Sequence, residues 1–579
     1  AGVLAELTTT PHVGIHRYTY KKETEATLVV DMDHLLDNEY IYEGWVKQTG
    51  ENELTGMRRT RGWVDNQYVF FVAQFSQPFS SMEQPSERQA VLTFDTTTGK
   101  PIVCKVGVSI VNEENARLNL EQETDSYGFD FDAIHQATRS DWEKELDVIT
   151  VEGGTEAERT NFYTALYHMF IHPNILQDVN GQYPAMESDK ILTTRHDRYT
   201  VFSLWDTFRN VHPFFTLAYP QKQLDMVQTL IDMYKEWGWL PRWELYGNET
   251  LTMSGDPAII MLADTWLRGL KNFDAETAYE AMVKSATAPS SENILRTDND
   301  DYMKLGYVPL REQFDNSVSH ALEYYLADFA LSRFAESLGL KEDAQTFAKR
   351  SLGYKHYYCK EFGTLRPILP DGSFYTPFDP LQGLNFEPAP GFHEGNAWNY
   401  TFYVPHDIGG LKRLMGGEKK FAAKLRKVFD ENFYDPANEP DITYPYLFAQ
   451  VKGEEWRTDL LVNSLLKKYF KNQPDGIPGN DDTGTMSAWA VFSMMGLYPD
   501  CPGIPRYTLV APAFDKIILH LDPRYYTQDT LVIECERPSP KAIYTDRITV
   551  NGKKHKGRFI FHEDLVNAGT IRFTLTEKK

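Results

Sequence analysis

Apolar and polar residues alternate in short runs through the first part of the chain. Runs such as YVFFVAQF and PIVCKVGVSIV are rich in β-branched and aromatic residues, and Gly, Pro, Asn and Asp separate them. A period of two with such breaks predicts short strands over residues 1–120. Several short strands favour an antiparallel sheet or sandwich. We therefore predict a partial N-terminal β-sandwich at residues 1–125.

The period changes near residue 128. Apolar positions then recur three and four residues apart, as in HALEYYLADFALSRFAESLG and GTMSAWAVFSMMGLY. This spacing predicts helices, and about a dozen segments show it. Long loops with Trp, Asp, His and Asn join many of them, and such loops often carry function. Paired inner and outer helices would form an (α/α)6 barrel over residues 126–500. A helical repeat array is the alternative, but the motif residues show no fixed period.

Strand patterns return after Pro499. YTLVAPAF, LVIECE and TIRFTLTEK are short, apolar-rich runs within residues 501–579. They predict a C-terminal β region, which either completes the N-terminal sheet or forms a separate β domain.

The charge of the chain limits its partners. A formal net charge of -23 argues against a nucleic-acid binder and against docking on anionic lipid. No apolar run approaches the length of a membrane-spanning helix. Aromatic residues make up 13% of the chain, which fits either a large aromatic core or stacking against ring-shaped ligands.

Cysteines and the first residues give less information. The four cysteines, Cys104, Cys359, Cys501 and Cys535, form no CxxC motif, so a zinc cluster is not expected, although their even number permits disulfides. The opening AGVLAELTTTPHVGIHRYTY lacks the basic and apolar regions of a signal peptide, which a mature or shortened chain would have lost.

Two adjacent aspartates, Asp481 and Asp482, stand at the start of an apolar helix in PGNDDTGTMSAWAVFSMMGLYP. One aspartate would suffice to cap the helix, a contribution of about 1 kcal/mol. The second aspartate therefore indicates a functional role.

Glu394 lies in GFHEGNAWNYTFYVPHD, just before another predicted helix. A glutamate in a first turn can simply complement the helix dipole. Here His393, Asn396 and Trp398 flank it, a combination typical of a sugar-binding site.

Three further clusters combine acids with amides, glycine or aromatic residues: Trp205, Asp206 and Arg209; Gly255 and Asp256; Asn438 and Glu439. Asp206 and Arg209 are three residues apart, so on a helix they could form a structural ion pair. The alternative is a grip on ligand hydroxyl groups.

Paired carboxyl groups on different loops indicate glycoside hydrolysis. One carboxyl protonates the leaving oxygen, and the other activates water or attacks directly. Glu394 and Asp482 could supply the two groups from opposite walls of one pocket. Oxygen-rich clusters without cysteine also suit a hard cation such as calcium.

Five motifs resemble glycoside hydrolase family 92, the calcium-dependent exo-acting α-mannosidases. They follow one another in the order of the family and span essentially the whole chain: SLWDTFRNVHPFFTL, VSHALEYYLADFALSRFAESLG, GFHEGNAWNYTFYVPHDIGGLKRLMGG, NEPDITYPYLF and GNDDTGTMSAWAVFSMMGLYP. The resemblance implies an N-terminal β-sandwich packed on an (α/α)6 barrel, with the active site between them and inversion at the anomeric carbon.

The resemblance also implies roles for the cluster residues. Glu394 would be the general acid and Asp482 the general base, with Asp481 beside it. Asn438 and Glu439 would lie near the Ca²⁺ ion and the leaving group. Trp205, Asp206 and Arg209 would line the pocket for the terminal mannose. The other residues expected to bind substrate are Gly255, Asp256, His393, Asn396 and Trp398.

Two departures from the family pattern bear on specificity. The chain starts after the β segment with a DPFIGTGG-like motif that usually opens the family. It also carries Asn438-Glu439 where α1,2-specific members often have His-Glu. An α1,2 linkage is the first expectation, and α1,3, α1,4 and α1,6 linkages stay open. The family implies a secreted or periplasmic enzyme acting on an N-glycan or mannan. The oligomeric state is not indicated.

Other functions are compatible with parts of this pattern. A mannoside-binding protein without hydrolysis would use the same aromatic and amide residues, but it would not need both Glu394 and Asp482. A phosphorylase would need a phosphate pocket, and GNDDTG offers acids instead. A mannosyl-phosphate hydrolase could dispense with the acid Glu394, because phosphate leaves without protonation.

Overall fold

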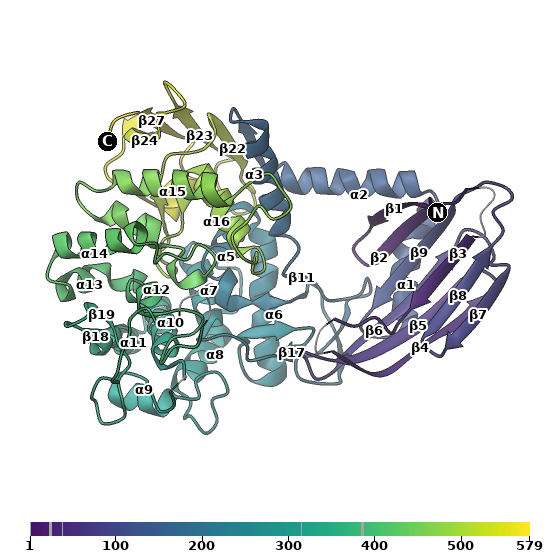
Figure 1. Ribbon diagram of the computed structural model, residues 1–579, viewed down its shortest axis with the longest axis horizontal. Coiled ribbons are helices and arrows are strands. Elements are labelled where there is room, and N and C mark those ends of the chain that lie inside the picture. The colour runs from purple at the N-terminus through teal and green to yellow at the C-terminus, as the bar shows by residue number, and fades with distance from the viewer. Residues whose placement is uncertain (1, 22–25, 37–38, 314, 384–386) are drawn as a thin grey trace. The chain divides into compact units, whose positions relative to one another are not determined.

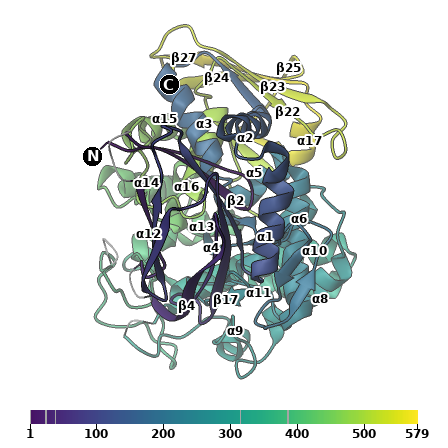
Figure 2. The same cartoon turned by 90° about the vertical axis from the view of Figure 1, so that its right-hand side faces the viewer.

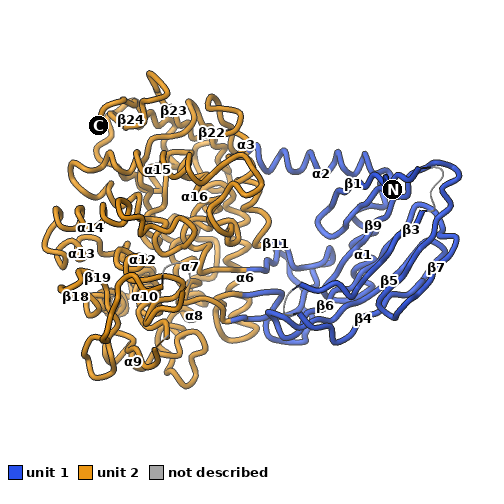
Figure 3. The backbone as a smooth tube through the Cα atoms, viewed as in Figure 1, with its two compact units in different colours: residues 1–147, 174–201, 244–250 blue, residues 148–173, 202–243, 251–579 orange. Residues whose placement is uncertain are grey.

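The computed structural model describes residues 2–21, 26–36, 39–313, 315–383 and 387–579. Two compact units make up the chain (Figure 3). Unit 1 contains the residues up to 147 with segments 174–201 and 244–250, and unit 2 contains 148–173, 202–243 and 251–579. The helices and the C-terminal strands thus share one unit. The predicted domain limits at residues 125 and 500 stay a prediction.

Unit 1 is built on two antiparallel sheets (Figure 1). In sheet order, the first contains β1 (Leu4–Thr9), β2 (Val13–Thr19), β9 (Ile102–Ser109), β6 (Gln67–Phe75), β5 (Glu53–Arg61) and β4 (Tyr40–Gly50). The second contains β3 (Ala26–Asp31), β8 (Gln89–Phe94) and β7 (Ser81–Ser86). One apolar core joins Leu92 of the small sheet to Phe71 and Phe75 of the large one. The predicted N-terminal β domain is confirmed.

The large sheet also buries its second face. Side chains along β6 alternate, so that Ala73 joins the core between the sheets and Val72 packs against helices. These helices are α1 (Glu113–Thr124) and α2 (Phe131–Leu146). A Cβ at Gly107 would lie 2.4 Å from the carbonyl oxygen of Ala116, so glycine permits this close approach. The prediction of strands up to residue 120 is wrong over α1, which has few apolar residues.

Short strands and loops complete unit 1. They include β11 (Asn174–Ile175) paired with β14 (Tyr199–Thr200), β12 (Gln182–Pro184) paired with β13 (Ile191–Thr193), and β17 (Asn248–Glu249).

Unit 2 is mainly helical, as the sequence predicts. Its helices are α3 (Glu156–His168), α4 (Leu204–Thr207), α5 (Val211–Ala218), α6 (Pro220–Trp237), α7 (Pro257–Leu267), α8 (Ala275–Thr287), α9 (Asn299–Leu305), α10 (Ser317–Ser337), α11 (Lys341–Arg350), α12 (Ala397–Thr401), α13 (Ile408–Leu414), α14 (Glu418–Asp430), α15 (Trp456–Tyr469), α16 (Thr485–Met495) and α17 (His562–Val566). Every residue of α5 and α16 is buried, which explains why their sequences are mostly apolar and contain no charged residue.

The C-terminal strands form their own sheet within unit 2 (Figure 2). Its order is β10 (Ile149–Glu152), β22 (Lys516–His520), β23 (Thr530–Glu536), β27 (Thr570–Thr576), β24 (Tyr544–Val550) and β25 (Lys553–Lys554). A smaller sheet contains β20 (Leu497–Tyr498), β21 (Arg506–Leu509) and β26 (Phe559–Phe561). The helical spacing after residue 128 also predicts helix over FDAIHQATRSDWEKELDVI, which is too long at its end because Ile149 belongs to β10.

Two sequence expectations concern the whole chain. In the part that the structure describes, no helix is both long and apolar enough to cross a bilayer. All four cysteines lie in this part, and each is buried and unbridged. The disulfides that their even number permitted are therefore not formed.

Candidate active site

The two adjacent aspartates have different surroundings. The Asp481 carboxylate accepts hydrogen bonds from the main-chain N–H of Ser487 (2.8 Å) and from its hydroxyl (2.9 Å). Its Oδ2 also lies 3.4 Å from Nδ1 of His168, and this contact raises the pKa of His168. Asp481 therefore holds the start of α16, the structural role that one aspartate was expected to fill.

Asp482 follows in a left-handed backbone conformation, with φ at 48°. Thr483 and Gly484 are left-handed as well, at 52° and 87°. A non-glycine residue in this region costs about 1–3 kcal/mol and persists only where its surroundings enforce it. The loop thus turns Asp482 away from the helix cap that Asp481 provides.

Glu394 is left-handed too, with φ at 48°. Main-chain and side-chain contacts fix its loop: the Asn438 amide donates to the carbonyl of Glu394, and the Tyr400 hydroxyl donates to that of His393 (2.7 Å). The Glu394 side chain remains 33% exposed, so solvent or a ligand can reach it.

His393 is neutral beside Glu394. Burial, together with the charges of His320 and Arg242, lowers the pKa of His393 to about 4. Because the Asn316 amide donates to Nδ1 (3.0 Å), the ring proton is on Nε2, which lies 4.0 Å from Oε2 of Glu394. A neutral imidazole does not stabilise the carboxylate form of its neighbour by charge.

Four carboxyl groups share one electrostatic environment. Burial raises the pKa of Glu394, and the Asp482 carboxylate raises it further. Burial and then Asp482 also raise the pKa of Asp206 well above its usual value. Burial, Asp206 and Asp482 do the same for Glu439. Asp482 itself has a raised pKa, because burial outweighs its hydrogen bond to Glu439. The structure therefore brings Glu394 and Asp482 into one acidic group, which we call the carboxyl cluster: Asp206, Glu394, Glu439 and Asp482.

Trp205, Asp206 and Arg209 come from α4 and the residues after it. The Trp205 ring packs edge-on against His393, with centroids 6.0 Å apart. Ser203 donates to the Asp206 carboxylate, whereas Arg209 forms its side-chain ion pair with Glu323 (3.0 Å). The expected structural pair of Asp206 with Arg209 is therefore replaced by a pair with α10. Arg209 still acts on Asp206, because its charge lowers the pKa of that carboxyl.

Three predicted substrate residues make contacts within the protein. Asn396 caps α12 by accepting from the N–H of Trp398 (2.8 Å). The Trp398 ring packs on Phe433, with centroids 4.9 Å apart, and lies under Lys424. Asp256 accepts from Arg296 (2.8 Å) and Ser285 (2.7 Å) in a fully buried network. Their contacts with a substrate stay a prediction.

Gly255 is closely packed. Its φ is 89°, and a Cβ there would lie 2.5 Å from Cβ of Glu323. The glycine thus makes room for a buried glutamate that the sequence analysis did not assign to the site. The signal for Glu323 was present, since it is an acid within the apolar run HALEYYLADFAL.

The residues expected near calcium offer oxygen atoms. Asn438 and Glu439 are 2% and 3% exposed, and the structure gives no hydrogen-bond partner to Oδ1 of Asn438, Oε1 of Glu439 or Oδ1 of Asp206. Buried oxygens without donors, in a cluster rich in carboxyl groups, fit a hard cation. Among the described residues, no three His, Cys, Asp or Glu side chains are grouped as a complete metal site, so amide, carbonyl or water oxygens would have to contribute.

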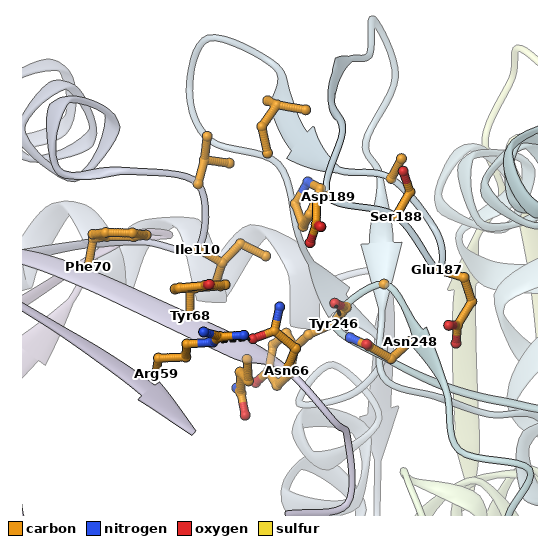
Figure 4. Close-up of a pocket in the computed structure, with 16 residues that line it drawn as sticks. Arg59, Asn66, Tyr68, Phe70, Ile110, Glu187, Ser188, Asp189, Tyr246 and Asn248 are labelled. Carbon is orange, nitrogen blue, oxygen red and sulfur yellow. Dashed lines mark hydrogen bonds between the residues drawn. The ribbon is translucent and has the colours of Figure 1, made fainter. Parts of the chain in front are cut away.

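Unit 1 contains a separate hollow of about 600 Å³, between β6 and the loops at residues 184–191 and 246–248 (Figure 4). Arg59 lies over the Tyr68 ring and donates to Oδ1 of Asn66 (2.7 Å). None of the predicted site residues lines this hollow.

An acid with a raised pKa and a second carboxyl group near it are the pair that glycoside hydrolysis requires. The glycosyl hydrolase family 92 catalytic domain model matches residues 115–577, and the N-terminal domain model of the same family matches residues 1–109. The chain belongs to glycosyl hydrolase family 92.

Solved structures support the same family. A family GH92 α-mannosidase from Bacteroides thetaiotaomicron, in complex with mannoimidazole, is 29% identical with a TM-score of 0.91. That match covers 100% of this chain and 79% of the other. A family GH92 inverting mannosidase from Bacteroides thetaiotaomicron VPI-5482 is 27% identical with a TM-score of 0.90, over 100% and 82% of the two chains.

A curated relative from Arthroderma benhamiae is described as an uncharacterized secreted glycosidase. It is 26% identical over 525 residues, which are 84% of this chain and 62% of the relative. The chain thus spans less than two thirds of that protein.

Proposed function

We propose that this chain is an exo-acting, calcium-dependent α-mannosidase that removes terminal α-linked mannose with inversion. The observation that carries the proposal is the electrostatic effect of Asp482 on Glu394. The two residues are 88 positions apart in the sequence, yet the Asp482 carboxylate raises the pKa of Glu394. The mannosidases among its structural relatives support mannose as the sugar.

Glu394 is the general acid in this mechanism. Because its pKa is raised, the Glu394 carboxyl group keeps its proton at pH values where an ordinary glutamate has lost it. That proton passes to the glycosidic oxygen as the bond to the mannosyl C1 breaks. The neutral His393 leaves the proton in place, because an imidazolium ion would favour its loss.

Asp482 is the general base, and it takes a proton from the water that attacks C1 on the opposite face. Such a single displacement requires carboxyl groups about 6.5–9.5 Å apart, with water and sugar between them. Asp481 positions the base by holding the start of α16. Burial raises the pKa of Asp482, so a positive charge near the cluster would help to keep it ionised.

A calcium ion would supply that charge. Asn438, Glu439 and Asp206 have the buried oxygen atoms to hold it. When bound, it would neutralise carboxylates and orient sugar hydroxyl groups.

The substrate proposal is a mannose-containing glycan, an N-glycan or a mannan, and α1,2 is the first linkage to test. The α1,3, α1,4 and α1,6 linkages stay open. We also propose that the helices of unit 2 form an (α/α)6 barrel and that the protein acts outside the cytoplasm, secreted or periplasmic. The secreted glycosidase among its relatives supports that location.

Linkage profiling on the four mannobioses tests the proposal, each with calcium and with EDTA. Proton NMR of the first product identifies its anomer, and β-mannose is expected. Absence of mannose release, together with binding of the disaccharide, would instead favour a mannoside-binding protein. Hydrolysis of mannose 1-phosphate esters alone would favour a mannosyl-phosphate hydrolase. Activity that EDTA leaves intact would remove calcium from the proposal.

A further inference from the structure

Glu323 is a buried acid of α10, only 1% exposed. Its Oε1 accepts from Nη2 of Arg209 (3.0 Å), and its Oε2 accepts from the Tyr403 hydroxyl (2.9 Å). Each carboxylate oxygen is therefore held by a different side chain. Removing one partner from such a pair is strongly destabilising, because the other charge is left buried and unpaired.

Arg209 is held equally firmly. Its Nε donates to the carbonyl of Trp205 (3.0 Å), and its guanidinium carbon lies 4.7–4.9 Å from the ring centroids of Trp205, Phe208 and Tyr403. Stacked rings and two fixed donors leave a planar guanidinium little freedom.

The fixed guanidinium acts on the carboxyl cluster. Its Nε holds the carbonyl of Trp205, the residue before Asp206, and the Trp205 ring packs edge-on against His393, the residue before Glu394. The direction in which Arg209 presents its remaining donors therefore matters for the site, and Glu323 sets that direction from the side of α10. Gly255 leaves room for the Glu323 side chain, because any side chain at position 255 would clash with it.

We propose that Glu323 is a positioning residue for the reaction: it does not touch the sugar, and it holds Arg209 in the orientation that the carboxyl cluster requires. This inference rests on the proposed function. It assigns to Glu323 an effect on turnover that passes entirely through Arg209.

The first test separates charge from hydrogen bonding. In Glu323→Gln the amide oxygen can still accept from Arg209, so we expect kcat within about 10-fold of wild type. In Glu323→Leu the guanidinium loses its anchor, and kcat should fall about 100-fold because misplacement by 1 Å has effects of this size. KM should change less than kcat in both.

The second test measures coupling with Arg209. In an Arg209→Met background, Glu323→Leu should cause no further loss of kcat, because the group it positions is already absent. The same double variant should have a higher Tm than Arg209→Met alone, since it no longer buries an unpaired carboxylate. Additive losses in kcat would overturn the proposal.

A matched control is available on α7. Asp264 is 3% exposed and pairs with the buried Arg268 (2.6 Å), and neither residue belongs to the carboxyl cluster. Asp264→Leu should lower the Tm and leave kcat unchanged. If Glu323→Leu lowers only the Tm in the same way, Glu323 is structural and the proposal is wrong.

Tyr403→Phe keeps the ring over Arg209 and removes one hydrogen bond to Glu323, so it serves if the Glu323 variants do not fold. We expect kcat to fall several-fold, roughly 3–10-fold, for a loosened anchor. Wild-type kinetics in this variant would count against positioning. A wild-type protein that releases no mannose would end the proposed function itself, and the positioning role with it. An active wild type with an unaffected Glu323→Leu would end only the positioning role.

Discussion

Asn438 donates a hydrogen bond from its side-chain amide to the main-chain carbonyl of Glu394. The two residues come from different loops, and Glu394 is held there in a left-handed conformation. The bond therefore links the segment expected near calcium to the residue expected to carry the catalytic proton. A strained backbone needs such support from its surroundings.

Asn438→Ala should release this loop. Without the amide, the Glu394 carboxyl samples other positions, and kcat/KM on a mannobiose should fall about 10–100-fold, the range for losing a supporting contact of this kind. The measurement is initial-rate kinetics at saturating calcium. Asn161→Ala is the matched control, because its amide also donates to a main-chain carbonyl, that of Phe470 (3.0 Å), outside the site. Equal activity of the two variants would contradict the supporting role.

Glu394→Gln should separate substrates by their leaving groups. A disaccharide needs protonation of its leaving oxygen, so we expect its hydrolysis to fall about 1,000-fold, within the usual range for a general acid. A 2,4-dinitrophenyl mannoside leaves without a proton and should lose less than about 10-fold. Glu342→Gln, at an exposed position of α11, controls for general effects of the substitution. Equal losses on both substrates would show that Glu394 is not the acid.

Calcium should stabilise the folded chain. Burial, Asp206 and Asp482 raise the pKa of Glu439, so its ionised form is unfavourable in the folded state. The folded state therefore loses stability as the pH rises from the ordinary glutamate pKa through this raised value. Glu439→Gln should therefore raise the Tm in EDTA, by about 2 °C, while reducing activity. Calcium should raise the Tm of wild type by mass action and that of the variant less. Magnesium at the same ionic strength is the control. A wild-type Tm that does not change when calcium is added would contradict the prediction.

His212 should make the protein less stable in mild acid. Burial lowers its pKa from 6.5 to about 4, so the unfolded chain binds this proton more readily than the folded one. Its contribution to the free energy of unfolding is fully present above about pH 6.5 and is lost as the pH falls towards 4. At pH 5 the loss amounts to about 2 kcal/mol.

Urea unfolding of wild type and His212→Gln at pH 7 and pH 5 tests this. The variant should be less stable at pH 7, because it disturbs the contacts with Thr207 and Gln223, and it should lose less stability on acidification. His520→Gln, at an exposed position, should leave the pH dependence unchanged. Parallel losses in wild type and His212→Gln would contradict the argument.

The helices were predictable because their apolar spacing is strong. Long segments such as α10 and α16 follow from the sequence, and so do the strand-rich ends of the chain. Helix α1 was not predictable in this way, since it has few apolar residues and its packing depends on the close approach of Ala116 to Gly107 of β9. Tertiary contacts, rather than local pattern, decide such segments.

The sequence indicated which acidic residues belong to the candidate site, but it indicated less well which role each of them has. The sequence indicated both Asp481 and Asp482 but could not tell which one caps α16, because three successive left-handed residues determine it. Trp398 lies in a motif typical of a sugar-binding site, and in the structure its ring packs on Phe433. Glu323 escaped notice because its partner lies 114 residues away.

Strand β10 has a consequence for dissecting the protein. It stands immediately before α3 in the sequence, yet its pairing partner is β22, more than three hundred residues later. Cutting the chain near residue 500 would leave its main-chain amides and carbonyls exposed along one edge, a template for aggregation. The helical part of unit 2 and the last strands should therefore be expressed together, because β10 completes its hydrogen bonds only when β22 pairs with it.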